Sequence, residues 1–245
     1  MIRRVALFAD SKVGFNITKF MIGEFKSDLV GVITVGDPNI ISLCNENSIP
    51  CLHYDDESKI VDFLNLENVD LCVLAWWPKI ISENLITVPK FGFINTHNSL
   101  LPHNRGKHPH FWAIIENLPY GVTLHQVDGG IDTGKIVAQR QIKYGWEDNS
   151  GTIYEKSLLE MISLFEDVYP ALREDGIIGV EQGDYGSFHW GRELDDASRI
   201  DLDRMYSARE LINIIRARTT DTDFPASFFK DCGDTYRIKV IIEKE

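Results

Sequence analysis

Residues 71–97 read LCVLAWWPKIISENLITVPKFGFINTH and contain two short apolar runs, Leu71 to Ala75 and Phe91 to Ile94. Runs of this kind are typical of strands that are buried on both faces of a parallel sheet. Similar runs occur at Val5 to Ala9 and Leu29 to Val35, and segments with a helical period lie between the runs. This alternation predicts an α/β fold, Rossmann-like, with a mostly parallel sheet flanked by helices.

Helices are predicted between the early strands, at Ile17 to Phe25 and Ile60 to Leu66. Two later strands, Val122 to Val127 and Ile136 to Ile142, flank a turn that contains two consecutive glycines. The sequence therefore places Asp132 in a loop between two sheet elements, where ligand-binding residues are common.

The C-terminal third contains two helix-start signals. Thr152 to Glu155 fits a capping box that opens a helix reaching about Leu172, and Ser207 to Glu210 fits a second one. The second helix is predicted to reach about Thr219 and to be followed by strands at 226–229 and 236–242, with a polar segment over residues 183–203 before it. We predict a catalytic domain over residues 1–180 and an extension over residues 181–245 with a helix and a β-hairpin.

Composition excludes several classes of partner. With 25 Lys plus Arg against 37 Asp plus Glu, the formal charge is -12, which disfavours nucleic acid or an anionic membrane as a partner. The four cysteines form no C-x-x-C pair, and the first apolar run ends at Asp10, too early for a signal peptide. No run approaches the roughly 18 apolar residues that span a bilayer, and no G-x-G-x-x-G follows the first strand. We expect a cytoplasmic protein with reduced thiols and no dinucleotide cofactor.

Three polar residues of the central segment can support proton-coupled acyl transfer. Asn95 and His97 follow an apolar run, and residues two apart in an extended segment project to the same side. An asparagine amide can donate to a developing oxyanion, and an imidazole can take a proton near neutral pH. A carboxylate such as Asp132 can orient that imidazole. The sequence therefore predicts an enzyme with Asn95, His97 and Asp132 as its catalytic residues.

Simpler explanations stay open for these residues. Asn-x-His at a strand end can be a satisfied turn or core pair, and Asp-x-Gly is a common turn signal. Five of the seven histidines fall within residues 97–125, which leaves a metallohydrolase as an alternative, although we expect no metal because H-E-x-x-H is absent. Catalysis by Ser99 as a nucleophile is disfavoured because no G-x-S-x-G motif surrounds it.

The run from Ile94 to Gly106, followed by Gly121 to His125 and Asp132 to Gly134, resembles the folate-dependent formyltransferase family. The resemblance is firm over residues 70–142 and looser over the N-terminal strands. It implies transfer of a formyl group from 10-formyltetrahydrofolate to an amine, with no metal.

The resemblance also implies roles for individual residues. Asn95, His97 and Asp132 match the three catalytic positions of the family, which implies direct attack by the amine, with His97 as base and Asn95 as oxyanion donor. By position, the loops Trp76 to Ile80 and Asp128 to Asp132 hold the pterin, although the tryptophans can also be ordinary packing residues. The folate-binding residues implied are Trp77, Pro78, Lys79, Arg105, Gly106, Lys107, Pro109 and Asp128.

The tail at Gly191 to Asp201 and Leu211 to Thr219 resembles nucleotide-linked sugar N-formyltransferases, of the type that acts on dTDP-4-amino-4,6-dideoxyhexoses. This implies a dTDP, UDP or GDP amino sugar as acceptor, destined for O-antigen or another lipopolysaccharide glycan. A pyrophosphate requires fixed cations, which arginine forks suit well, although each can equally be a solvated surface cation. The predicted acceptor-binding residues are Ser99, Asn104, Arg216, Arg218 and Phe224, with Arg105 and Lys107 as further cations and Phe229 as a further aromatic.

Other acceptors and other classes stay open. The same chemistry could act on methionyl-tRNA or a glycinamide ribonucleotide, although the tRNA enzyme carries a separate nucleic-acid-binding domain. A non-catalytic sensor of folate or nucleotide sugar would bind without turnover. The exposed edge of the C-terminal hairpin also makes a homodimer through the extension possible.

Overall fold

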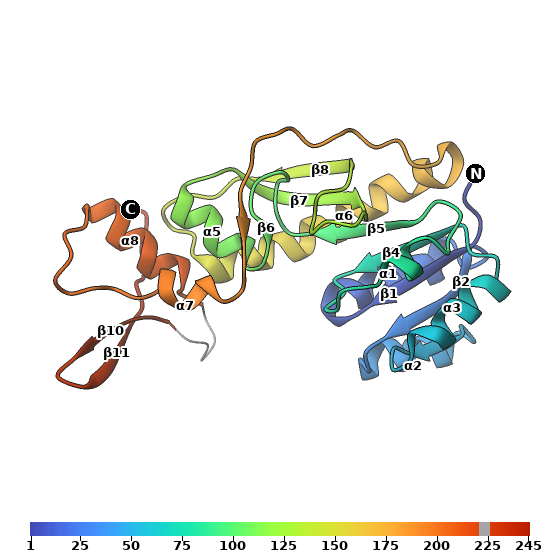
Figure 1. Ribbon diagram of the computed structural model, residues 1–245, viewed down its shortest axis with the longest axis horizontal. Helices are drawn as coiled ribbons and strands as arrows, with labels where there is room; N and C mark the ends of the chain where they lie inside the picture. The colour runs from blue at the N-terminus through green and yellow to red at the C-terminus, as the bar shows by residue number, and fades with distance from the viewer. Residues whose placement is uncertain (221–225) are drawn as a thin grey trace. The chain divides into compact units, whose positions relative to one another are not determined.

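The computed structural model describes residues 1–220 and 226–245 (Figure 1). The chain forms two compact units, each assembled from several segments. The first unit comprises Met1–His97, Thr123–Gln139 and Leu158–Gln182, and the second comprises Asn98–Val122, Arg140–Ser157 and Gly183–Glu245. The boundary predicted near residue 180 stays a prediction.

A seven-stranded sheet with the order β3-β2-β1-β4-β5-β7-β8 organises the fold. Its strands β1, β2, β3, β4 and β5 pair in parallel, and β7 pairs antiparallel with β5. The strands are β1 (Val5–Ala9), β2 (Leu29–Thr34), β3 (Cys51–His53), β4 (Leu71–Ala75), β5 (Phe93–His97), β7 (Tyr120–Gln126) and β8 (Ile136–Ile142). The mostly parallel α/β fold predicted from the sequence is therefore confirmed.

The helices of the described residues alternate with these strands in the N-terminal half and continue beyond them. They are α1 (Ser11–Glu24), α2 (Pro38–Glu46), α3 (Glu57–Leu66), α4 (Glu83–Ile86), α5 (Pro109–Glu116), α6 (Ser150–Asp175), α7 (Glu193–Ala197) and α8 (Ala208–Ala217). None of these helices combines the length and the apolar content that a membrane crossing requires.

The central strands β1 and β4 are buried along their whole length, which explains why their sequences are uninterrupted apolar runs. Phe8 and Phe93 contact each other in the core with their ring centroids 5.2 Å apart. Residues of α3, including Ile60 and Leu64, complete this core cluster. In parallel sheets whose strand order reverses, ligands bind beyond the carboxyl ends of the strands, and here the order reverses between β1 and β4.

Several predicted boundaries were wrong, among them the starts of β5 and α1. Strand β5 begins at Phe93, because Gly92 adopts a positive φ of 70° in the turn before it, and it continues through Asn95 to His97. Helix α1 begins at Ser11, well before Ile17.

The start of α6 also differs from the prediction. The helix begins at Ser150, so Thr152 does not cap it as predicted. Asn149 Oδ1 instead accepts from the Thr152 amide, and Thr152 Oγ1 accepts from the Asn149 amide, both at 3.0 Å. The Asn149 and Thr152 side chains therefore exchange the two hydrogen bonds that close the helix start.

The predicted C-terminal helix and hairpin are confirmed. Ser207 Oγ accepts from the Glu210 amide at 3.1 Å and so caps α8, as the sequence indicated. Strands β10 (Ser227–Asp231) and β11 (Asp234–Ile238) pair antiparallel. Two shorter strands of the second unit, β6 (Arg105–Gly106) and β9 (Phe188–His189), pair in parallel.

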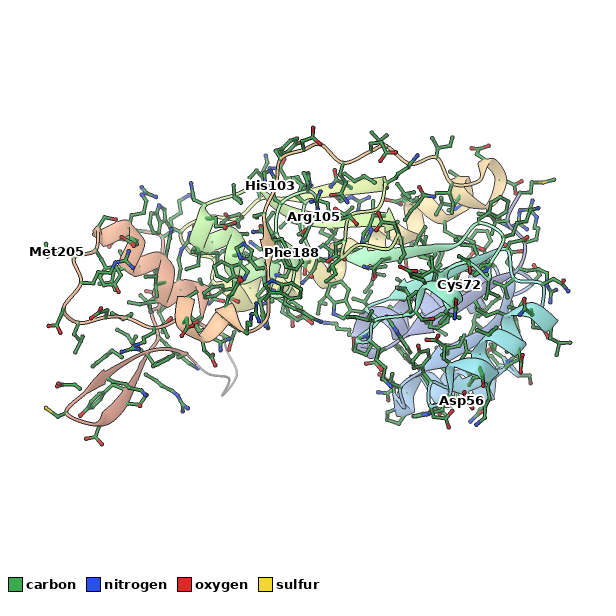
Figure 2. All side chains as sticks on the ribbon, in the orientation of Figure 1. Asp56, Cys72, His103, Arg105, Phe188 and Met205 are labelled. Carbon is green, nitrogen blue, oxygen red and sulfur yellow. The ribbon has the colours of Figure 1, made fainter. Side chains whose placement is uncertain are left out.

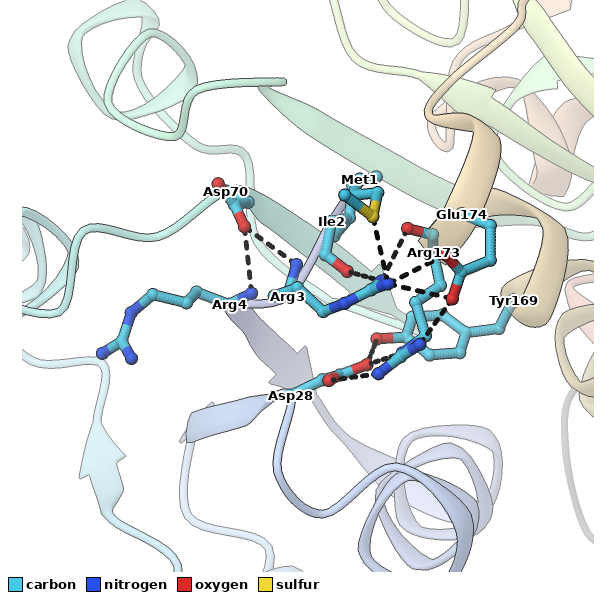
Figure 3. A network of polar contacts seen from close by, with 9 residues as sticks. All are labelled: Met1, Ile2, Arg3, Arg4, Asp28, Asp70, Tyr169, Arg173 and Glu174. Carbon is cyan, nitrogen blue, oxygen red and sulfur yellow. Dashed lines mark hydrogen bonds and ion pairs between the residues drawn. The ribbon is translucent and has the colours of Figure 1, made fainter.

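A polar network attaches the end of α6 to the start of the chain (Figure 3). Asp28, whose side chain is 2% exposed, accepts from Arg173 Nε at 2.5 Å and from the Tyr169 hydroxyl at 3.2 Å. Arg3 donates to the Arg173 carbonyl at 2.9 Å and pairs with Glu174 at 2.8 Å. The hydrogen bonds from Arg173 and Tyr169 satisfy the buried Asp28 carboxylate, which would be strongly destabilising without a partner.

Candidate active site

The three predicted catalytic residues meet within the first unit. Asn95 and His97 lie on β5, and Asp132 lies in the loop between β7 and β8. The Asn95 Nδ2 and Asp132 Oδ1 atoms are 3.4 Å apart, and His97 Nδ1 and Asp132 Oδ2 are 3.6 Å apart. The side chains of His97 and Asp132 are 8% and 12% exposed. An amide, an imidazole and a carboxylate therefore share one nearly dry cluster.

His125 is a fourth member of this cluster. It lies on β7 opposite Asn95 in the antiparallel pairing. Its Nδ1 is 2.7 Å from the Gln126 carbonyl oxygen, which only accepts, so this nitrogen carries the proton. In the neutral ring Nε2 is then an acceptor, and it lies 3.1 Å from Asn95 Nδ2. The same Nε2 lies 3.4 Å from Asp132 Oδ1, so His125 contacts both the Asn95 amide and the Asp132 carboxylate. In the sequence, His125 belongs to the Gly121 to His125 motif and to the histidine-rich stretch, and its alternation with Thr123 on one strand was the available signal for a role in the site.

The loop that carries Asp132 is closely constrained. Asp132 has a positive φ of 53°, which is uncommon for a residue other than glycine. Asp128 Oδ1 accepts from the Gly130 amide at 3.0 Å and from Thr133 Oγ1 at 2.6 Å. A Cβ at Gly134 would overlap the Gln126 carbonyl oxygen, so only glycine fits there. Residues on both sides of Asp132 thus restrain the backbone that carries its carboxylate.

A second strained junction follows β4. Trp76 has a φ of 58°, and its amide donates to Thr96 Oγ1 at 2.9 Å. The Thr96 hydroxyl in turn donates to the Leu74 carbonyl at 3.0 Å. Because Thr96 lies between Asn95 and His97, one side chain joins the Trp76 junction to the strand that carries both site residues.

The two loops predicted to hold a pterin are exposed and carry apolar side chains. Ile80 is 88% exposed and Ile131 is 41% exposed. Trp77 packs edge-on against Phe8, with their ring centroids 5.3 Å apart. The buried Nε1 of Trp77 has no hydrogen-bond partner among the described residues. The two loops thus combine exposed apolar side chains with a buried indole N–H that has no partner in the part of the chain that the structure describes.

Neighbouring charged groups of these loops have structural partners. Lys79 Nζ lies 5.1 Å from the centroid of the Tyr54 ring and donates to the Tyr54 carbonyl at 3.3 Å. The Tyr54 hydroxyl donates to Glu57 at 2.7 Å, and Ser82 also donates to Glu57. The Ser82 hydrogen bond, which is the largest effect, and that of Tyr54 lower the pKa of Glu57, although burial opposes them. Pro78 is exposed beside these groups.

The remaining predicted folate residues belong to the second unit. Arg105 and Gly106 form β6, and Figure 2 labels Arg105 and Phe188, which are register partners on β6 and β9. Gly106 has a φ of +88°, and a Cβ there would overlap the His189 carbonyl. The Lys107 side chain is exposed, and Pro109 is the first residue of α5.

Two predicted acceptor residues are buried in this unit. Asn104 is 1% exposed, and its Nδ2 donates to Glu116 Oε2 at 2.9 Å and to Ser187 Oγ at 3.2 Å. Ser99 is fully buried. These contacts give Asn104 a role in holding the β6 and β9 segments together.

The C-terminal cations differ from each other. Arg216 is 5% exposed; its Nη1 donates to the carbonyls of Gly145 and Asp148, and its Nε donates to Asn213. Its Nε and Nη1 donors thus serve the fold, and its role as an acceptor ligand stays a prediction. Arg218 pairs with Asp195 at 3.1 Å, and burial lowers the pKa of its guanidinium.

The two predicted aromatics also differ. Phe229 stacks on Tyr236 within the hairpin, with their ring centroids 5.2 Å apart. Phe224 lies outside the described residues. The part of the chain that the structure describes contains no group of three or more His, Cys, Asp or Glu side chains arranged to hold a metal.

Two solved structures that this chain resembles in fold are named as formyltransferases. A 4-N formyltransferase from Francisella tularensis aligns over 99% of both chains with a TM-score of 0.81 and 24% identity. The formyltransferase PseJ from Anoxybacillus kamchatkensis, solved with UDP-4,6-dideoxy-4-formamido-L-AltNAc and tetrahydrofolate, aligns over 79% of this chain and 88% of its own with a TM-score of 0.58 and 27% identity. The fold and the residue cluster thus define a formyltransferase-like protein.

Sequence comparison identifies the family. The formyl transferase model matches residues 42–166, more than half of the chain, and the N-formyltransferase dimerization C-terminal domain matches residues 193–244. The chain therefore belongs to the formyl transferase family. A dTDP-4-amino-4,6-dideoxyglucose formyltransferase of Mycobacterium tuberculosis is 29% identical over 153 residues, which are 62% of this chain and 65% of the relative. The chain spans between 24% and 65% of the length of the first curated relatives that it matches.

Proposed function

We propose that this protein is a folate-dependent N-formyltransferase that moves a formyl group from 10-formyltetrahydrofolate to the amino group of a nucleotide-linked sugar. The meeting of Asn95, His97 and Asp132 in one nearly dry cluster carries the proposal. We further propose a dTDP-linked amino-dideoxy sugar as acceptor, because the Mycobacterium relative is named for that substrate and PseJ was solved with a UDP-linked sugar of related chemistry.

The folate supplies an activated formyl group on nitrogen, so no covalent enzyme nucleophile is required. His97 presents Nδ1 to Asp132, which leaves Nε2 on the opposite side of the ring to take the proton of the attacking amine. The Asp132 carboxylate then stabilises the protonated imidazole. The same proton can pass to the departing folate nitrogen, which balances the transfer.

Asn95 is placed to stabilise the formyl oxygen as it becomes negative. The Asn95 Nδ2 atom lies 3.1 Å from His125 Nε2 and 3.4 Å from Asp132 Oδ1, so its contact with Asp132 is the longer one. The weaker contact is the one that can be exchanged for the formyl oxygen without turning the amide. His125 acts here as a positioning residue for the oxyanion donor.

For the donor, we propose a pterin site between the loops Trp76 to Ile80 and Asp128 to Asp132. Trp77, Pro78, Lys79 and the backbone around Asp128 belong to these loops. Gly129 lies beside the Glu83 carboxylate of α4, so the Asp128 loop and the segment after the first loop are neighbours. Arg105, Gly106, Lys107 and Pro109 remain proposed contacts of the donor.

For the acceptor diphosphate and for the oligomeric state, we propose one candidate residue and one interface. Arg218, with a buried Nε that has no hydrogen-bond partner among the described residues, is the best C-terminal candidate for a diphosphate. The dimerization-domain match over residues 193–244 supports a homodimer through the C-terminal extension. We also propose residues 1–180 as the catalytic part and residues 181–245 as this extension.

One experiment tests reaction and acceptor together. The protein is incubated with 10-formyltetrahydrofolate and a panel of dTDP, UDP and GDP amino sugars, and tetrahydrofolate release and formylated product mass are followed. Methionyl-tRNA and glycinamide ribonucleotide serve as comparison acceptors. Turnover of an amino sugar alone supports the proposal, whereas binding of folate and sugar without turnover of any acceptor would identify a sensor instead.

A further inference from the structure

Gln182 makes two contacts with the loop that carries Asp132, and no role for it follows from the sequence. Its Nε2 donates to the carbonyl oxygen of Asp132 and to that of Gly134, each at 2.8 Å. Gln182 is separated from Asp132 by 50 residues of sequence. One side-chain amide therefore holds the backbone on both sides of Thr133.

The segment before Gln182 is in fixed register with the same loop. The Ile136 amide donates to the Val180 carbonyl and the Val180 amide donates to the Ile136 carbonyl, both at 2.8 Å. Gly179 lies against the Lys135 side chain. The Gln182 side chain is thus delivered to the loop from an anchored backbone.

The loop conformation requires such support. Asp132 has a positive φ of 53°, a conformation that costs a residue other than glycine about 1 kcal/mol or more. The Asp128 side chain accepts hydrogen bonds from Gly130, before Asp132, and from Thr133, after it, but these bonds do not involve the Asp132 carbonyl. Gln182 supplies the restraint on that carbonyl.

We propose that Gln182 is a positioning residue that keeps the Asp132 carboxylate against His97 by clamping the Asp132 and Gly134 carbonyls. This inference rests on the proposed function, in which Asp132 acts through His97. If the clamp is lost, the Asp132 backbone can leave its strained conformation and carry the carboxylate away from the 3.6 Å contact with His97.

The test compares three variants with the wild-type full chain. Gln182→Met keeps the length of the side chain and removes both N–H groups, and Gln182→Glu places an acceptor oxygen where the donor was. Glu181→Gln is the matched control, because it removes the neighbouring ion pair with Lys135, at 2.9 Å and largely exposed, without touching the loop carbonyls.

The proposal predicts that Q182M lowers kcat about 10-fold to 100-fold while KM for the acceptor changes less than about 3-fold, since a displacement of about 1 Å can lower a rate 10²-fold. The acidic limb of its kcat/KM profile moves to lower pH, because His97 loses the carboxylate that favours its protonated form. E181Q keeps the wild-type rate and profile.

A wild-type kcat and pH profile in Q182M would overturn the proposal, and so would an equal loss in E181Q. If Q182M does not fold, as judged by circular dichroism, Q182E is held to the same criteria. Hydrogen exchange of the 131–135 amides gives a readout without activity: faster exchange in Q182M than in E181Q is expected, and equal exchange would refute the clamp. This separates failure of the clamp from failure of the proposed activity, which appears as an inactive wild type.

Discussion

Replacement of Thr96 by valine tests how the strand that carries the site residues is joined to β4. Thr96 is 6% exposed, accepts from the Trp76 amide at 2.9 Å and donates to the Leu74 carbonyl at 3.0 Å. Valine has nearly the same shape and no hydroxyl, so the Trp76 amide loses its partner. A buried group left unsatisfied costs about 1–3 kcal/mol. We expect Thr96→Val to lower the free energy of unfolding by about 2 kcal/mol.

The assay is urea denaturation. If the m-value is the same in both proteins, a change in the urea concentration at the midpoint reports a change in stability alone. Thr87→Val is the matched control, because Thr87 Oγ1 also donates to a backbone carbonyl, that of Asn84 at 3.0 Å, but lies exposed. Its stability should stay within about 0.5 kcal/mol of wild type. Thr96→Ser keeps the hydroxyl and should recover most of the loss. A T96V protein as stable as wild type, or less disturbed than T96S, would show that the Thr96 hydroxyl does not hold the Trp76 junction.

Three further predictions concern the site and the stability of the fold. Asn95→Ala should lower turnover by about 10² to 10³, the usual effect of losing one oxyanion donor, and a variant with near-wild-type kcat in the formyl-transfer assay would refute that role. Burial, followed by the charges of His108 and Arg218, lowers the pKa of His110 to about 3. The unfolded chain then binds a proton that the folded chain does not, so stability should fall between about pH 6.5 and pH 3 as the pH is lowered. His110→Phe should flatten this part of the curve of stability against pH, and an unchanged slope would contradict the argument. Arg173→Ala should lower the midpoint of thermal unfolding, because it leaves the buried Asp28 carboxylate without its cation, and Asp28→Asn in the same background should restore part of that loss.

The parallel half of the sheet was predictable because its strands are buried on both faces. β1 and β4 match their predicted bounds, since every side chain in them is apolar. The end of β5 was misplaced because Asn95 and His97 interrupt the apolar pattern, although both remain within the strand. The short edge strand β3 has no continuous apolar run, so periodicity gave no signal for it.

The candidate site was predictable where its signal is local. The spacing of Asn95 and His97 predicts two side chains on one face, and family resemblance added Asp132. The contacts of Gln182 had no such signal, since 50 residues separate its amide from the carbonyl that accepts from it. Arg216 is a related case, because nothing along the chain indicated that its Nε and Nη1 atoms donate to Asn213, Gly145 and Asp148.

The sequence by itself determined which segments are apolar enough to form the central strands and which residue types could move a proton and stabilise an oxyanion. Those properties depend on a residue and its near neighbours, so they can be read along the chain. Only the tertiary structure brought His125 to Asn95, the Gln182 amide to the Asp132 loop, and the Arg216 guanidinium to Gly145 and Asp148. Each of these depends on hydrogen bonds between distant segments, because a donor satisfied by a far part of the chain looks the same in sequence as one left for a ligand.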